Sequence, residues 1–258
     1  MRKQTRLYCI ISLLIFLTGC GIFDTELTDI KKRNVLRVGI KMDVPGFGYL
    51  NPETNELEGM EIDLAHALAK ELIGKNAEVE FVGVTSKIRG PLLNNGGLDV
   101  VIATFTITEE RLEQFNFSKP YYVDEIGFMV LKDSPIKGIA DLDGKVIGVA
   151  QTGTAMDALK AEIEGQNINL TFKEFASYPE IVGALLNKEI DVFTVDKSIL
   201  RGYLTEQTII LDDGFNPQDY GIATKLENNT LAQRVNLFVD TMKKSGELDK
   251  LIEKWDLK

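Results

Sequence analysis

VIATFTITEER, residues 101–111, begins with three apolar residues, continues through three threonines and ends at an arginine. The apolar start is typical of a buried strand, and Thr104 and Thr106, two apart, are expected on one face of it. Arg111 offers a planar guanidinium that matches a carboxylate with two hydrogen bonds. Alternatively, Arg111 is a surface residue at a helix start. The stretch predicts a strand that leads into one wall of a polar pocket.

Strand-like and helix-like segments alternate on both sides of this stretch, which predicts an α/β fold with a largely parallel sheet. The alternation occurs in two similar units of about a hundred residues, which favours two lobes over one growing core. In the first unit, strands are expected at 36–40, 79–84 and 100–103, and helices at 59–73 and 91–93. In the second, strands are expected at 145–150 and 191–196, and helices after 154 and at 178–186; residues 231–255 are expected to be helical.

The N-terminus has the pattern of an export signal. Arg2, Lys3 and Arg6 precede an apolar run at 7–17 that is too short for a bilayer, which takes ~20 residues. A buried N-terminal helix is the alternative. The sequence LTGC at 17–20 resembles the lipobox of bacterial lipoproteins, in which the cysteine is lipidated and begins the mature chain. Cys20 is therefore the expected lipid site, and Cys9, the other cysteine, is removed with the signal.

Net charge excludes one class of partner. Removing residues 1–19 takes away three positive charges and no carboxylate, so the formal charge moves from −10 to −13. A domain this acidic is repelled by nucleic acid, and we expect no nucleic-acid partner. Residues 20–33 are polar and charged, and they are expected to form a tether.

Missing residue types limit catalysis. His66 is the sole histidine and is expected on the outer face of the helix at 59–73, so we expect neither a histidine-dependent triad nor a multi-histidine metal site. The chain has no Gly-Lys-Ser/Thr phosphate loop, so an ATPase must be a separate protein. We expect neither a cofactor nor a metal.

Several motifs, taken in order, resemble the extracellular solute-binding proteins of polar amino acid ABC importers, and most closely those for aspartate and glutamate. The resemblance covers nearly all of residues 35–257. It rests on GMEIDLA at 59–65, RGPLL at 89–93, LDV at 98–100 leading into the threonine stretch, FSKPYY at 117–122, VDKSIL at 195–200 and YGIA at 220–223.

The resemblance implies two Rossmann-like lobes joined by two crossover strands, the type II periplasmic-binding-protein fold. The crossings are expected near 122–127 and 218–223. Lobe 1 is then formed by 34–124 and 221–258, and lobe 2 by 125–220. The ligand is expected between the lobes, where small-molecule sites are common.

A free amino acid carries an α-carboxylate and an α-ammonium, and burying either without a partner costs several kcal/mol. By resemblance, Arg111 with Thr104 and Thr106 holds the carboxylate and Asp196 holds the ammonium. Asp196 is alternatively the N-cap of the following helix. Thr154 and neighbouring amides stand at a helix N-terminus, which favours anions. This loop has Ala155 where the family commonly has a second threonine.

Side-chain selectivity is expected to depend on Lys41 and Arg89, which the acidic-ligand members share; surface charges are the alternative for both. Tyr220, in the returning crossover, is expected to bind the ligand or line the hinge.

We therefore expect a monomeric, lipid-anchored receptor on the outer face of the cytoplasmic membrane that delivers aspartate or glutamate to an ABC permease. Glutamine is the main rival ligand. The same fold could also serve a surface adhesin, a sensor or a dehydratase-like enzyme, although we expect no enzyme.

Overall fold

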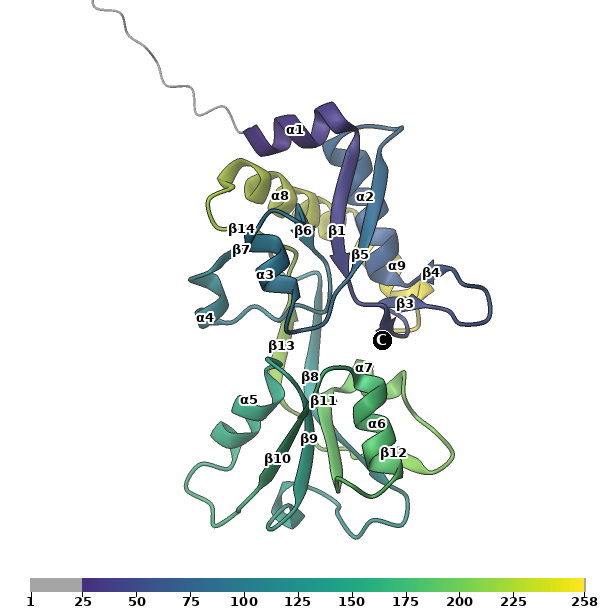
Figure 1. The fold of residues 1–258 in the computed structure, drawn as a ribbon, viewed down its shortest axis with the longest axis vertical. Helices are drawn as coiled ribbons and strands as arrows, with labels where there is room; N and C mark the ends of the chain where they lie inside the picture. Colours follow the sequence, from purple (N-terminus) through teal and green to yellow (C-terminus); the bar gives the residue numbers. More distant parts are fainter. Residues whose placement is uncertain (1–24, 258) are drawn as a thin grey trace, which may run out of the picture.

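The computed structural model describes residues 25–257, which form two α/β lobes stacked along the long axis of the molecule (Figure 1). Lobe 1 contains a sheet in the order β5-β1-β6-β14-β7, and lobe 2 a sheet in the order β10-β9-β11-β8-β12, with β13 also paired to β8. The predicted two-lobe α/β fold is confirmed.

Lobe 1 has a parallel centre and an antiparallel edge. β1 pairs in parallel with β5 and β6, whereas β14 runs antiparallel to β6 and β7. The sheet strands are β1 (Val35–Ile40), β5 (Glu78–Gly83), β6 (Val100–Val101), β7 (Phe115–Phe117) and β14 (Ala223–Lys225), and a small separate sheet contains β2 (Asp43–Val44), β3 (Gly48–Leu50) and β4 (Leu57–Glu58). The helices are α1 (Thr25–Arg33), α2 (Met60–Leu72), α3 (Arg89–Asn94), α4 (Glu109–Leu112), α8 (Asn229–Ser245) and α9 (Glu247–Lys254).

Lobe 2 is covered by a helix on each face of its sheet. Side chains alternate along β8, so Phe128 packs into the cluster that contains α5 and Met129 into the cluster that contains α6. The strands are β8 (Tyr122–Leu131), β9 (Val146–Ala150), β10 (Thr171–Phe175), β11 (Val192–Asp196), β12 (Thr208–Ile210) and β13 (Phe215–Tyr220). The helices are α5 (Ala155–Glu162), α6 (Tyr178–Leu186), α7 (Lys197–Arg201) and a 3-10 turn at Ile139–Asp141.

Two long strands carry the chain between the lobes. β8 leaves lobe 1 and β13 returns to it, and the two pair antiparallel, with Tyr122 opposite Tyr220.

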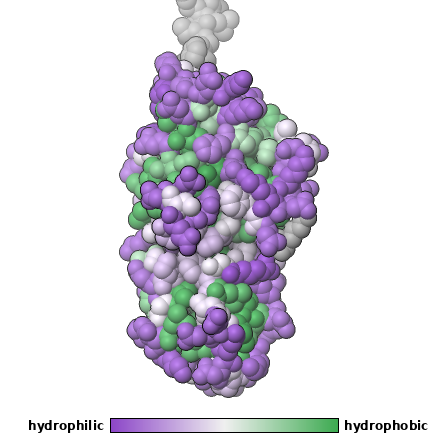
Figure 2. Space-filling model, turned by 90° about the vertical axis from the view of Figure 1, so that its right-hand side faces the viewer, coloured by the Kyte–Doolittle hydropathy of each residue, from purple (hydrophilic) through white to green (hydrophobic). Residues whose placement is uncertain are grey.

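Hydrophilic residues dominate the face of the molecule in Figure 2, with smaller hydrophobic patches between them. No helix within residues 25–257 has both the length and the apolar character to cross a bilayer.

The lobes touch one another in this structure. One buried apolar cluster contains residues of both lobes, including Ile40 and Phe47 of lobe 1 and Phe193 of lobe 2. The Tyr203 hydroxyl of lobe 2 donates to the Asp43 carbonyl of lobe 1. The two lobes are therefore in direct contact across part of the space between them.

Three expected elements differ from the structure. Residues 25–33 of the expected tether form α1, because Ile30 is fully buried against lobe 1. The expected helix at 231–255 is two helices, since Gly246 ends α8 at φ 75°, a conformation that glycine adopts without a Cβ penalty. The strand expected at 100–103 ends at Val101, and Thr104 then turns the chain with a φ of 44°.

The start of α2 is fixed by backbone contacts. Gly59 has φ 130°, and a Cβ there would lie 2.0 Å from the Phe47 carbonyl oxygen. That same oxygen accepts from the Glu61 N–H at 2.9 Å, which satisfies one of the free N–H groups of the first turn. The close approach therefore needs glycine at 59, and it places Glu61 inside lobe 1.

Candidate functional site

Six of the eight predicted ligand-binding residues line a small inner pocket between the lobes. They are Arg89, Thr104, Thr106, Arg111, Thr154 and Asp196. The inner pocket has a volume of about 20 Å³, close to the space of one water molecule. An amino acid is larger than this space, so the inner pocket must widen before it can hold one.

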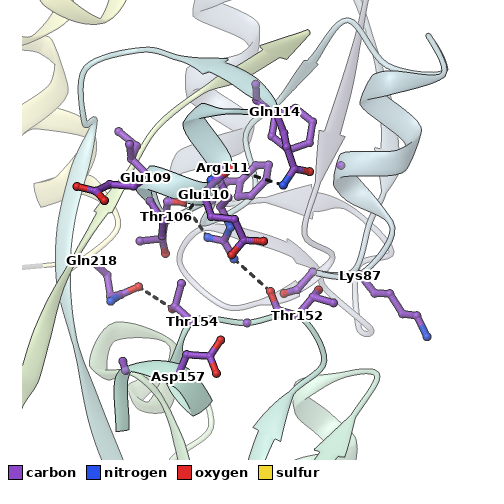
Figure 3. A pocket seen from close by; sticks show the side chains of 18 of the residues that line it. Lys87, Thr106, Glu109, Glu110, Arg111, Gln114, Thr152, Thr154, Asp157 and Gln218 are labelled. Carbon is purple, nitrogen blue, oxygen red and sulfur yellow. Dashed lines mark hydrogen bonds between the residues drawn. The ribbon is translucent and has the colours of Figure 1, made fainter. Parts of the chain in front are cut away.

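A larger outer cleft of about 800 Å³ opens beside the inner pocket, and Figure 3 shows the side chains that line it. Arg111 projects across it from α4 in lobe 1. Its Nη1 donates to the Thr106 carbonyl at 2.8 Å and its Nη2 to the Thr152 carbonyl of lobe 2 at 3.1 Å. Arg111 therefore bridges the lobes at the boundary between the outer cleft and the inner pocket.

Arg111 lies in a short helix and also faces the space between the lobes, so both alternatives that the sequence left open are present. It belongs to the four-residue helix α4, whose first turn is capped by the Thr108 side chain accepting from the Arg111 N–H at 3.2 Å. Its guanidinium is nevertheless directed into the space between the lobes. Burial, and then the positive charge of Arg89, lower the pKa of Arg111 to about 9, so it remains a cation at neutral pH.

Asp196 lies on the opposite lobe, at the carboxyl end of β11, and is buried. Its side chain does not cap α7. It instead accepts a hydrogen bond from the Tyr220 hydroxyl. Burial, reinforced by the nearby charge of Asp124, raises the pKa of Asp196 to about 7. A cation that reached this carboxylate would stabilise its charged form.

Tyr220 supports Asp196 rather than lining the inner pocket. The Tyr220 side chain is fully buried on β13, and its hydroxyl also lies 3.5 Å from Asp124 of β8. Asp124 accepts from the Ser198 N–H at 3.1 Å and from its hydroxyl. The network connects the pocket carboxylate to both crossover strands.

Thr154 is also tied to a crossover. Its hydroxyl donates to the Gln218 Oε1 at 2.7 Å, and Figure 3 shows this contact below Arg111. Thr154 precedes α5, and its side chain makes no capping hydrogen bond to that helix. The loop therefore presents Thr154 to the pocket and is held by β13.

Arg89 is buried and bound to backbone. Its Nη1 donates to the Ala103 carbonyl at 2.6 Å and to the Thr104 carbonyl at 3.2 Å. Its Cζ lies 3.9 Å from the centre of the Phe105 ring, and the Arg111 Cζ lies 4.9 Å from the same ring. Phe105 thus contacts both guanidinium groups, and the electron-rich face of its ring attracts their positive charge.

Lys41 does not line the inner pocket. Its Nζ pairs with the Asp43 carboxylate at 3.0 Å and lies 4.5 Å from the centre of the Tyr178 ring. Burial lowers the pKa of Lys41, whereas Asp43 opposes the shift. The buried Lys41 and the half-buried Asp43 therefore form an ion pair at the lobe interface.

Thr104 has an unexpected backbone conformation. Its φ is 44°, which is uncommon for a β-branched residue, and its N–H donates to the Glu61 carboxylate at 2.6 Å. A strand continuing through Thr104 is incompatible with this turn, so β6 ends early. Thr106 returns to extended pairing through an isolated bridge with Tyr220.

Sequence reasoning missed Glu61, Phe105 and Tyr178. Glu61 had a visible signal, because it shares a helical stripe with Ala65, Leu68 and Leu72, all of them buried. A carboxylate on an apolar stripe needs a specific partner. Phe105 and Tyr178 had no comparable signal, since buried aromatic residues are common in any core.

The family model for bacterial extracellular solute-binding proteins, family 3, matches residues 36–258. The chain is 36% identical over 236 residues to the ABC transporter glutamine-binding protein GlnH of Bacillus subtilis, covering 89% of this chain and 84% of the relative. It is 38% identical over 204 residues to the glutamine-binding protein of Geobacillus stearothermophilus, covering 78% and 76%. A glutamate-binding protein GluB, from Corynebacterium efficiens, is 29% identical over 257 residues, covering 92% and 85%.

Solved structures show the same fold. A mutant of the arginine-binding protein ArgBP from T. maritima has a TM-score of 0.80 and 30% identity, covering 90% of this chain and 100% of that one. The ancestral amino acid-binding protein AncCDT-1, a precursor of cyclohexadienyl dehydratase, has a TM-score of 0.78 and 30% identity, covering 89% and 98%.

We predict that Arg111→Ala and Asp196→Asn each weaken amino acid binding by about 2 to 5 kcal/mol, because each leaves a ligand charge without its partner in a buried site. The loss should be similar for every amino acid ligand, since the α-groups are common to all. Calorimetric titration of the domain from residue 25 onward measures it.

Lys87→Ala and Asp157→Asn are the matched controls, because both residues line the outer cleft and are exposed. They should bind like wild type. Wild-type affinity in a folded Arg111→Ala or Asp196→Asn protein contradicts the assignment.

Proposed function

The chain belongs to the bacterial extracellular solute-binding proteins of family 3, and from that premise we propose that it captures an amino acid, with glutamine preferred, for an ABC importer. The observation that carries the proposal is the placement of Arg111 and Asp196. They approach the inner pocket from different lobes, so a zwitterion between them pairs its carboxylate with one and its ammonium with the other.

Two observations support a neutral side chain on that zwitterion. The Lys41 ammonium is paired with Asp43, and the Arg89 Nη1 donates to two backbone carbonyls, so both cations already have partners within lobe 1. Two relatives above 30% identity are glutamine-binding proteins. An amide can donate and accept in the inner pocket without adding a buried charge.

Glutamate or aspartate, the ligands expected from the sequence, remain the second proposal. The observation in their favour is the Arg89 Nε, a buried donor for which the structure provides no hydrogen-bond partner. A ligand side-chain carboxylate that reached it would satisfy the donor and add a charge-assisted bond. The glutamate-binding relative is consistent with this second proposal.

Titration of the purified domain with glutamine, glutamate, asparagine and aspartate tests the proposal. We expect the lowest dissociation constant for glutamine and a weaker one for glutamate, by at least the ~1.4 kcal/mol that corresponds to tenfold. Tighter binding of glutamate than of glutamine contradicts the preference and supports the second proposal. Binding of none of the four contradicts both.

We also propose that a lipid on Cys20 anchors the protein to the outer face of the membrane, beside its permease. Cys20 lies outside the described residues. α1 begins at Thr25 and lies at the end of lobe 1 that faces away from lobe 2 (Figure 1). Five residues reach at most about 18 Å, so such an anchor would hold this end of lobe 1 near the membrane surface.

Cys20→Ser should abolish incorporation of labelled fatty acid and release the protein from membranes or leave it unprocessed, because the lipid is attached through the cysteine sulfur. Cys9→Ser is the matched control, since it removes the other cysteine of the chain from the expected signal segment. The control should be labelled like wild type. Label in the Cys20→Ser protein contradicts the anchor site.

A further inference from the structure

Glu61 is a fully buried carboxylate that does not line the inner pocket. Its Oε1 accepts from the Thr104 N–H at 2.6 Å and from the Tyr121 hydroxyl. Its Oε2 is buried, and the structure provides no hydrogen-bond partner for it. A charge in such a place is costly unless it interacts with an opposite charge.

The opposite charge is that of Arg89, and the Thr104 backbone lies between it and Glu61. Glu61 binds the N–H of Thr104, and Arg89 binds the carbonyl groups of Thr104 and Ala103. A carboxylate and a guanidinium thus hold the pocket-lining Thr104 backbone from both of its polar groups, at a φ of 44°. The positive charge of Arg89 also opposes the burial effect on the Glu61 pKa, so the two charges interact.

The site then has a partner for each of its cations. Lys41 pairs with Asp43, and Arg89 interacts with Glu61 through Thr104. Arg111 and Asp196 face the inner pocket, where an amino acid supplies one charge of each sign. A neutral side chain leaves this balance of charges unchanged. A second ligand carboxylate adds an unmatched negative charge near Glu61.

We propose that Glu61 is a positioning residue that sets side-chain selectivity: its negative charge offsets Arg89 and makes the site favour an amide over a carboxylate. The inference rests on the proposed function, the binding of glutamine in preference to glutamate. It assigns that preference to a residue that lies behind the ligand site and acts through Thr104 and Arg89.

Selectivity should then depend on pH. Burial raises the pKa of Glu61 to about 7; hydrogen bonds from Tyr121 and Thr104 and the charges of Arg89 and Lys41 oppose the shift. All four of these groups lie outside α2. As pH falls from 8 to 6, Glu61 gains a proton and loses its charge, so discrimination against glutamate should weaken. The glutamate side chain stays ionised in this range.

The ratio of the glutamate to the glutamine dissociation constant isolates this effect. Asp196 also titrates near pH 7, but it meets the α-ammonium that both ligands share, so its protonation cancels in the ratio. Glu61→Gln keeps the size of the side chain and an oxygen that accepts from Thr104 and Tyr121, and it removes the charge. Glu53→Gln, at an exposed position, is the control with the same change in net charge.

We expect Glu61→Gln to lower the ratio by about tenfold at pH 8, the equivalent of one pKa unit of interaction. The wild-type ratio should fall between pH 8 and pH 6, and in Glu61→Gln it should stay flat. Glu53→Gln should behave like wild type. A folded Glu61→Gln protein with the wild-type ratio at pH 8 overturns the proposal.

The wild-type pH series needs no variant, so the inference stays testable if Glu61→Gln does not fold. A wild-type ratio that is constant from pH 6 to pH 8 overturns it. Wild-type protein that prefers glutamate at pH 8 contradicts the proposed glutamine preference. In that case, a further shift toward glutamate in Glu61→Gln still supports the role of Glu61, which separates the two failures.

Discussion

The structure depends on one constraint: charges buried between the two lobes must be matched. Arg89, Lys41 and Asp196 are all buried, and a buried charge without a partner is among the most costly features of a protein interior. Lys41 is matched within lobe 1, by Asp43. Arg111 and Asp196 lie on different lobes, so a zwitterionic ligand between them would supply what each lacks.

The crossover strands are hydrogen-bonded to residues that line or support the inner pocket. Tyr220 of β13 donates to Asp196, Gln218 of β13 accepts from Thr154, and Asp124 of β8 accepts from Ser198. The groups that hold the pocket are therefore bound to the strands about which the lobes would move. Because the inner pocket has room for about one water molecule, it must widen to hold an amino acid, and a hinge movement about these strands would provide that space.

Much of this arrangement could be predicted from the sequence. Apolar periodicity located α2 and β11, and the paired α/β units indicated two lobes. The motif resemblance brought Arg111, Asp196 and both threonines to one pocket. The left-handed turn at Thr104 could not be predicted, because it depends on Glu61 and Arg89, 43 and 15 residues away in the chain. The pairing of Lys41 with Asp43 is local, yet a strand pattern does not reveal which of two neighbouring charges turns inward.

The most direct test is the proton released when glutamine binds at pH 7. Asp196 has a pKa of about 7 in the free site, so it is about half protonated, and pairing with the α-ammonium should ionise it fully. Calorimetry in buffers of different ionisation enthalpy should therefore detect release of roughly half a proton per ligand, and none in Asp196→Asn. Binding of glutamine to wild type without proton release, or equal release in Asp196→Asn, would contradict the account of matched buried charges.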